Sequence, residues 1–204
     1  MNRDDLSNKL IHFTKGERDD AIKTFHKILQ ERVLLGGAGN IDGGFKCVCF
    51  SESPISKLPH ILADREYFEF PYAPLGIMVD KPWLFSRGGR PVIYQPKGEF
   101  DGLPLNIRWR HKTYDPIAGV DCTWEREWRI PIDTLPLDPQ QMTVIVPDRR
   151  SVENFKTSHT SSTQAQIRGV LRYGTLSEAN ITDAVQDLPW HFIALEDLGV
   201  KVDW

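Results

Sequence analysis

The sequence predicts an α+β fold in a single domain that spans residues 1–204. Short apolar runs of strand length recur along the chain and are bounded by Gly, Pro or Asp. A few helical patterns are interposed among these runs, which is the order expected of the α+β class. A length of 204 residues with 40% hydrophobic residues suits one sizeable core.

The strand pattern is clearest at 142–146, where Met-Thr-Val-Ile-Val is dominated by β-branched residues. Similar runs give the other expected strands, at 10–13, 45–50, 76–79, 91–94, 128–130, 167–173 and 191–195. Segment 96–121 carries scattered Pro, Gly and Asp, so we expect it to be irregular.

An amphipathic helix is expected over 17–33, because apolar residues recur there at helical spacing. Its buried face should comprise Ala21, Ile22, Phe25, Ile28, Leu29 and Val33, and its exposed face Asp19, Asp20, Lys23, Lys27 and Arg32. The Gly-rich run 36–40 should end it. Shorter helices are expected at 54–63, from 151 and over 176–188, and the Ser/Thr-rich segment 159–163 is interpreted as a linker.

Charge and cysteine usage exclude several classes of protein. A formal net charge of −3, from 25 basic and 28 acidic residues, excludes an obviously basic nucleic-acid binder. Cys47, Cys49 and Cys122 are expected to be reduced thiols, and no Cys/His spacing typical of zinc is present, so no metal is expected. The polar N-terminus and the lack of an apolar run of ~18 residues predict a cytoplasmic protein with no membrane partner.

Residues with the potential for chemistry lie in or beside three of the expected strands. His12 lies at the end of the first, Ser51 follows the second, and Glu125 and Glu127 lie in the run Trp-Glu-Arg-Glu-Trp-Arg-Ile. If that run is a strand, Glu125, Glu127 and Arg129 share one face. Each feature also has a structural interpretation, as a hydrogen-bonded histidine, a helix N-cap or cross-strand salt bridges.

The order of these motifs resembles a known family. A His-Phe-Thr strand, an amphipathic helix, a Gly-rich loop, Cys-Phe-Ser-Glu and a later Glu-Trp-Arg are similar to the small bacterial ADP-ribosyltransferase-like proteins, which include the DarT toxins and the AbiGi-type abortive-infection proteins. The resemblance covers about 10–130. It implies an ADP-ribosyltransferase-like fold with mixed or antiparallel sheets and flanking helices around an NAD cleft.

The resemblance also implies roles for three catalytic residues. His12 would bind the ribose of NAD, with Thr14 assisting, and Ser51 would position either that ribose or the glutamate. Glu127 would stabilise the cation-like sugar as nicotinamide leaves. We therefore expect His12, Ser51 and Glu127 to line one cleft on a common face of the sheet.

Other residues of the implied NAD site come in alternatives. Phe50 or Tyr94 would stack on nicotinamide, and Arg90 or Arg129 would bind the pyrophosphate. Two choices stay open. The first is whether Glu125 or Glu127 is the catalytic glutamate. The second is whether Ser51 or a tyrosine fills the second motif, because many relatives have a tyrosine there; the candidates are Tyr67, Tyr72 and Tyr94.

The implied function is transfer of ADP-ribose from NAD to a nucleic-acid or protein acceptor, in a bacterial toxin or anti-phage defence effector with a possible cognate antitoxin. One alternative is a catalytically inactive ADP-ribosyltransferase fold that acts as a binding or antitoxin module. A second is a nuclease or other hydrolase in which Glu125 and Glu127 hold a metal ion.

Overall fold

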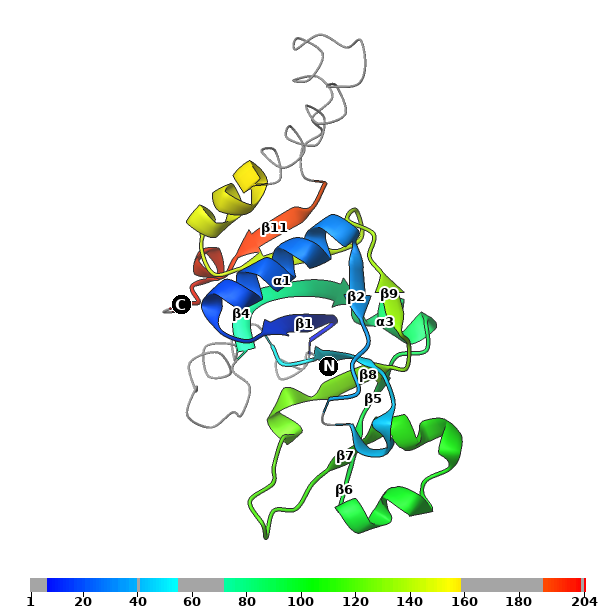
Figure 1. Ribbon diagram of the computed structural model, residues 1–204. Helices are drawn as coiled ribbons and strands as arrows, with labels where there is room; N and C mark the ends of the chain where they lie inside the picture. The colour runs from blue at the N-terminus through cyan, green and yellow to red at the C-terminus, as the bar shows by residue number, and fades with distance from the viewer. Residues whose placement is uncertain (1–6, 40, 55–71, 159–188, 203) are drawn as a thin grey trace, which may run out of the picture.

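The computed structural model describes residues 7–39, 41–54, 72–158, 189–202 and 204. Within these ranges the centre is a seven-stranded sheet of order β11-β10-β4-β1-β3-β8-β5 (Figure 1). In that order the strands are His191–Ala194, Thr143–Val146, Tyr72–Asp80, Lys9–Lys15, Val48–Ser51, Glu127–Ile130 and Arg90–Pro91. Neighbours are antiparallel except β10 and β11, which are parallel. The predicted mixed α/β architecture is confirmed.

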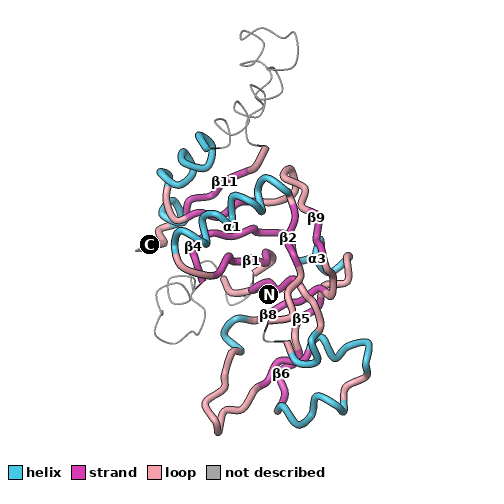
Figure 2. Tube along the Cα trace, viewed as in Figure 1, coloured by secondary structure: helices cyan, strands magenta, loops and turns pink. Residues whose placement is uncertain are grey.

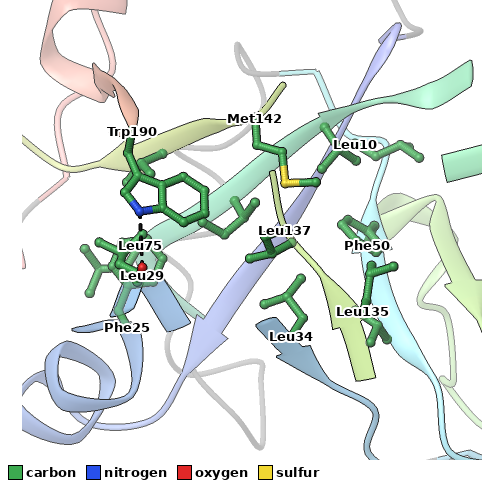
Figure 3. Close-up of a cluster of buried hydrophobic side chains, with 14 of the residues drawn as sticks. Leu10, Phe25, Leu29, Leu34, Phe50, Leu75, Leu135, Leu137, Met142 and Trp190 are labelled. Carbon is green, nitrogen blue, oxygen red and sulfur yellow. Dashed lines mark hydrogen bonds between the residues drawn. The ribbon is translucent and has the colours of Figure 1, made fainter. Parts of the chain in front are cut away.

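Helix α1 (Arg18–Glu31) lies across one face of this sheet (Figures 1 and 2). Ala21, Phe25 and Leu29 are buried, while Ile22 and Ile28 are partly buried against the same core. Figure 3 shows how this core continues toward β11, where the indole Nε1–H of Trp190 donates to the carbonyl oxygen of Leu29 at 3.2 Å. The predicted apolar face of the helix is therefore confirmed.

The helix ends earlier than predicted. Arg32 adopts a left-handed conformation (φ 54°), and its N–H closes the last turn on the carbonyl of Ile28. Val33 then begins strand β2 (Val33–Leu35), which pairs with β9 (Thr134–Pro136). Val33 fits the apolar spacing of the helix, but this spacing does not distinguish the last helical residue from the first residue of a following strand.

Several other boundaries differ from the prediction. The run 91–94 is divided between β5 and β6 (Ile93–Gln95), which belong to different sheets. The segment expected to be irregular contains the 3₁₀ helices η3 (Lys97–Gly102) and η4 (Leu105–Arg110) and strand β7 (His111–Thr113), which pairs with β6. The short elements not predicted are η1 (Asp42–Gly44), α3 (Lys81–Ser86), η5 (Thr123–Glu125), β9 and η6 (Leu195–Leu198).

Near the C-terminus, residues 149–158 are helical, which confirms the helix expected from 151. The strand expected at 167–173, the linker at 159–163, the helix at 176–188 and nearly all of the helix at 54–63 lie outside the described residues. Among the described helices, none combines the length and apolar character required to cross a bilayer.

Phe25→Leu is expected to lower the free energy of unfolding by about 1–2 kcal/mol. The Phe25 ring is fully buried and meets the Phe155 ring edge-on at 5.4 Å, so the smaller side chain leaves a void. Urea denaturation measures the change. Lys23→Ala, on the exposed face, is the control and should change stability by less than about 0.5 kcal/mol. Equal effects of the two substitutions would contradict the packing.

Candidate functional site

A pocket of ≈ 430 Å³ lies where β1, β3 and β8 meet the chain between β2 and β3. Its size is within the range of small-molecule sites. The polar part of its wall comprises His12, Thr14, Lys15, Thr24, Ser51, Tyr72, Lys112, Glu125, Glu127 and Arg129. The rest is mostly apolar and includes Ile28 of α1, Leu35 and Ile41, with Gly37 and Gly39 between them.

Glu127 is held by a buried arginine. The Nε and Nη2 groups of Arg129 donate to its Oε1 and Oε2 at 2.7 and 3.2 Å. Burial alone would raise the pKa of Glu127, but the hydrogen bonds and charge of Arg129, together with Lys112, hold that pKa below its usual value. Glu127 is therefore ionised at neutral pH and has a fixed orientation.

Glu125 reaches the same pocket with fewer partners. The hydroxyl of Tyr72 donates to its Oε1 at 2.8 Å, and the Lys112 ammonium lies 4.0 Å from its Oε2. The same ammonium is 3.5 Å from Oε2 of Glu127, so Lys112 bridges the two carboxylates. Burial and the carboxylate of Glu125 raise the pKa of Tyr72, which stays a hydrogen-bond donor at neutral pH.

Backbone geometry explains why both glutamates face the pocket. Strand β8 begins at Glu127, one residue before the strand predicted at 128–130, and the run 124–130 is not a strand throughout, because Glu125 ends the 3₁₀ turn η5. Arg126 between them takes a left-handed conformation (φ 45°), which is rare for a residue with a side chain. Such backbone strain often marks a functional site.

Ser51 fixes this turn from the neighbouring strand. Its hydroxyl donates to the carbonyl of Glu125 at 2.7 Å and accepts the N–H of Ser53 at 3.2 Å. The Ser53 hydroxyl in turn donates to the carbonyl of Trp124 at 2.7 Å. Of the two roles expected for Ser51, the contacts match positioning of a glutamate, here Glu125.

Strand register separates His12 from this cluster. Ile11 pairs with Ser51, and Ser51 pairs with Glu127, so these three side chains share one face of the sheet. His12 belongs to the opposite face, where its ring packs edge-on to Phe50 with centroids 5.8 Å apart. His12, Ser51 and Glu127 do line one pocket, as expected, but the expectation of a common face is wrong for His12.

His12 reaches the pocket because β1 and β3 separate there. The two strands pair at Ile11 and Ser51. Further along β3, the carbonyl of Cys49 is bonded by the ring of His12 and not by the backbone of β1. A carbonyl can only accept, so the Nδ1–H of His12 donates this 2.8 Å bond. Burial lowers the pKa of His12 and outweighs the Cys49 contact. The ring is thus neutral at pH 7, with the Nε2 lone pair available to a ligand.

The low pKa of His12 predicts a loss of stability in mild acid. Below the reference value of 6.5 the unfolded chain binds a proton that the folded chain does not, so the free energy of unfolding should fall as the pH drops from about 7.5 to about 5.5. His12→Gln should reduce this slope, because an amide does not titrate in this pH range. The amide can still donate to the carbonyl of Cys49, so the local structure should be kept. His26, whose pKa burial also lowers, leaves a residual slope.

Urea denaturation at the two pH values measures both slopes. Glu127, with its lowered pKa, contributes only at more acidic pH, because its stabilisation is lost as the pH falls below about 4.5. Identical slopes for His12→Gln and the parent protein would contradict a buried, neutral His12.

Two residues expected at the NAD site lie outside the pocket. The Arg90 guanidinium stacks on Phe85 at 3.9 Å and donates to the carbonyls of Phe85 and Gly89. The Tyr94 hydroxyl donates to the carbonyl of Cys122 and accepts the N–H of Glu127, so Tyr94 supports β8 from outside. Neither residue lines this pocket.

Three further expectations need adjustment. Besides Glu127, Arg129 bonds the carbonyls of Trp109 and His111, which leaves little of its guanidinium for pyrophosphate. Phe50 is among the residues that line the pocket, but its side chain is 2% exposed and belongs to the main core, so it offers little surface to a ligand. The hydroxyl of Thr14 donates to the carbonyl of Leu75 and offers a ligand only its lone pairs.

The site also contains residues that sequence reasoning missed or left open. Lys112 lies in the segment expected to be irregular, and nothing in the sequence pairs it with the glutamates. Tyr72 was one of three tyrosine candidates and is in the pocket wall, whereas Tyr67 lies outside the described residues. Among the described residues, no group of three or more His, Cys, Asp or Glu side chains has a geometry that could hold a metal ion.

Comparisons with protein-family models, with curated proteins and with solved structures find no match for this chain.

Proposed function

We propose that this protein transfers ADP-ribose from NAD to a nucleic-acid or protein acceptor, as a bacterial toxin or anti-phage defence effector. The observation that carries the proposal is the presence of Glu125 and Glu127 with Tyr72 and His12 in one pocket of ≈ 430 Å³. Carboxylates beside a departing nicotinamide stabilise the positive charge that develops on the ribose.

Each of the pocket side chains has a separate role in the proposed reaction. Nicotinamide leaves with the electron pair of its bond to the ribose C1′, and an acceptor heteroatom forms the new bond to that carbon. Glu127, fixed by Arg129, supplies negative charge near the sugar, and Glu125 takes the proton that the acceptor loses. The Nε2 lone pair of His12 accepts a hydrogen bond from a ribose hydroxyl.

Lys15 replaces the arginines as the candidate for pyrophosphate binding. Of the pocket-lining cations, Lys112 and Arg129 are paired with the glutamates. Lys15 has no carboxylate partner among the described residues; its ammonium lies 4.7 Å from the centre of the Tyr72 ring. An anionic group in the pocket would therefore find its counter-charge at Lys15.

One observation favours the alternative of a non-catalytic binding module, including an antitoxin partner. Glu127 is charge-compensated by Arg129 and Lys112, as in a structural ion pair. In that case the pocket binds a ligand or a protein segment without bond cleavage.

Nicotinamide release from labelled NAD separates the two functions. The purified protein is incubated with labelled NAD and a bacterial lysate, which supplies an acceptor. Release of nicotinamide together with a labelled macromolecule supports transfer. NAD binding without either product supports the non-catalytic module, and the absence of both binding and cleavage contradicts an NAD site.

A further inference from the structure

The two pocket glutamates are bridged by a cation that belongs to the protein itself. The Lys112 ammonium lies 3.5 Å from Oε2 of Glu127 and 4.0 Å from Oε2 of Glu125. With Arg129, this gives two positive and two negative charges in the cluster. Any cationic ligand that approached the carboxylates would compete with Lys112 for the same oxygens.

Lys112 comes from a strand outside the seven-stranded sheet that carries Glu127. It lies in β7, which pairs with β6 and is not part of the seven-stranded sheet. Arg129 anchors the start of β7 by donating to the carbonyls of Trp109 and His111 at 3.0 and 2.6 Å. The backbone is thus fixed, while the four-carbon lysine stem leaves the ammonium free to move.

The wall beside the carboxylates also suits a cation. The Tyr72 hydroxyl bonds Glu125, and its ring already has the Lys15 ammonium 4.7 Å from the ring centre. An aromatic face next to two carboxylates attracts cations through the ring quadrupole as well as through charge. Two lysine ammonium groups therefore lie at the surfaces that a ligand cation would contact.

We propose that Glu125, Glu127 and Tyr72 form a subsite for a cationic ring, which the Lys112 ammonium occupies until such a ligand displaces it. The nicotinamide ring of NAD carries a positive charge and is a ligand of this class; that identification rests on the proposed function. The lysine then balances the charge of the cluster formed by Glu125, Glu127 and Arg129, and lowers the affinity of the subsite for cations.

Calorimetry with a pair of ligands that differ in charge tests this subsite. 1-Methylnicotinamide is a permanent cation, and nicotinamide is its neutral counterpart. Lys112→Gln should bind 1-methylnicotinamide about tenfold more tightly than the parent protein at low salt, because the cluster gains one net negative charge. Nicotinamide binding should change by less than about twofold, because a neutral ring does not respond to that charge.

Two variants serve as controls. Lys112→Arg keeps the charge and should behave like the parent protein. Lys46→Gln removes an exposed ammonium that pairs with Asp133 and should have no effect on either ligand. Circular dichroism shows that each variant is folded.

The outcomes also separate this inference from the proposed function. An equal change for both ligands in Lys112→Gln, or no binding of the cation by that variant, would overturn the subsite. Selective tightening without any NAD cleavage would support the subsite and count against the transferase. NAD cleavage without selective tightening would support the transferase and count against the subsite.

Discussion

Arg129→Met is expected to lower the free energy of unfolding by about 3–5 kcal/mol, because it leaves the buried carboxylate of Glu127 with the more distant Lys112 ammonium, at 3.5 Å, as its counter-charge. The Arg129 side chain is 1% exposed, and its hydrogen bonds join β8 to the backbone at Trp109 and His111 as well as to Glu127. The substitution therefore removes one partner of a buried ion pair and two contacts to backbone carbonyls.

The double variant Glu127→Gln/Arg129→Met separates these contributions. If the lost charge compensation of Glu127 dominates, the double variant should be more stable than Arg129→Met alone, since the buried carboxylate of Glu127 is then absent. Thermal and urea unfolding measure both. A loss below about 1 kcal/mol for Arg129→Met would mean that water reaches the pair and that Glu127 is less firmly held than the contacts indicate.

The fold could be predicted from the sequence where one pattern dominated. The apolar face of α1 and the β-branched run of β10 each have a single solution, and the structure has them at the expected places. Prediction failed where the deciding contact is distant in sequence. Val33 continues the helical spacing, but its pairing with Pro136 of β9 makes it a strand residue.

The candidate site divides in the same way. Glu125, Glu127 and Ser51 could be identified from their positions beside expected strands, and their convergence follows from the pairing of β3 with β8. His12 was placed on the wrong face, because the motif order carries no information about register. Lys112 could not have been found, since its role depends on β7 lying against the pocket.

Glu127→Gln is expected to slow NAD cleavage by about 10²–10⁴-fold if Glu127 stabilises the ribosyl cation, because the amide keeps the size of the side chain and removes its charge. The substitution also leaves Arg129 without its counter-charge, so stability must be measured alongside activity. Assays at a temperature where the variant is fully folded keep the two effects apart.

Glu125→Gln is the matched comparison. Its amide oxygen can still accept the Tyr72 hydroxyl, and Glu125 has no buried arginine to leave unpaired, so we expect it to stay as stable as the parent protein and to lose less activity than Glu127→Gln. Nicotinamide release from labelled NAD gives both rates. A larger loss for Glu125→Gln would exchange the roles and make Glu127 the partner that holds Lys112 and Arg129. Unchanged rates for both would remove the carboxylates from the mechanism and leave the pocket as a binding site.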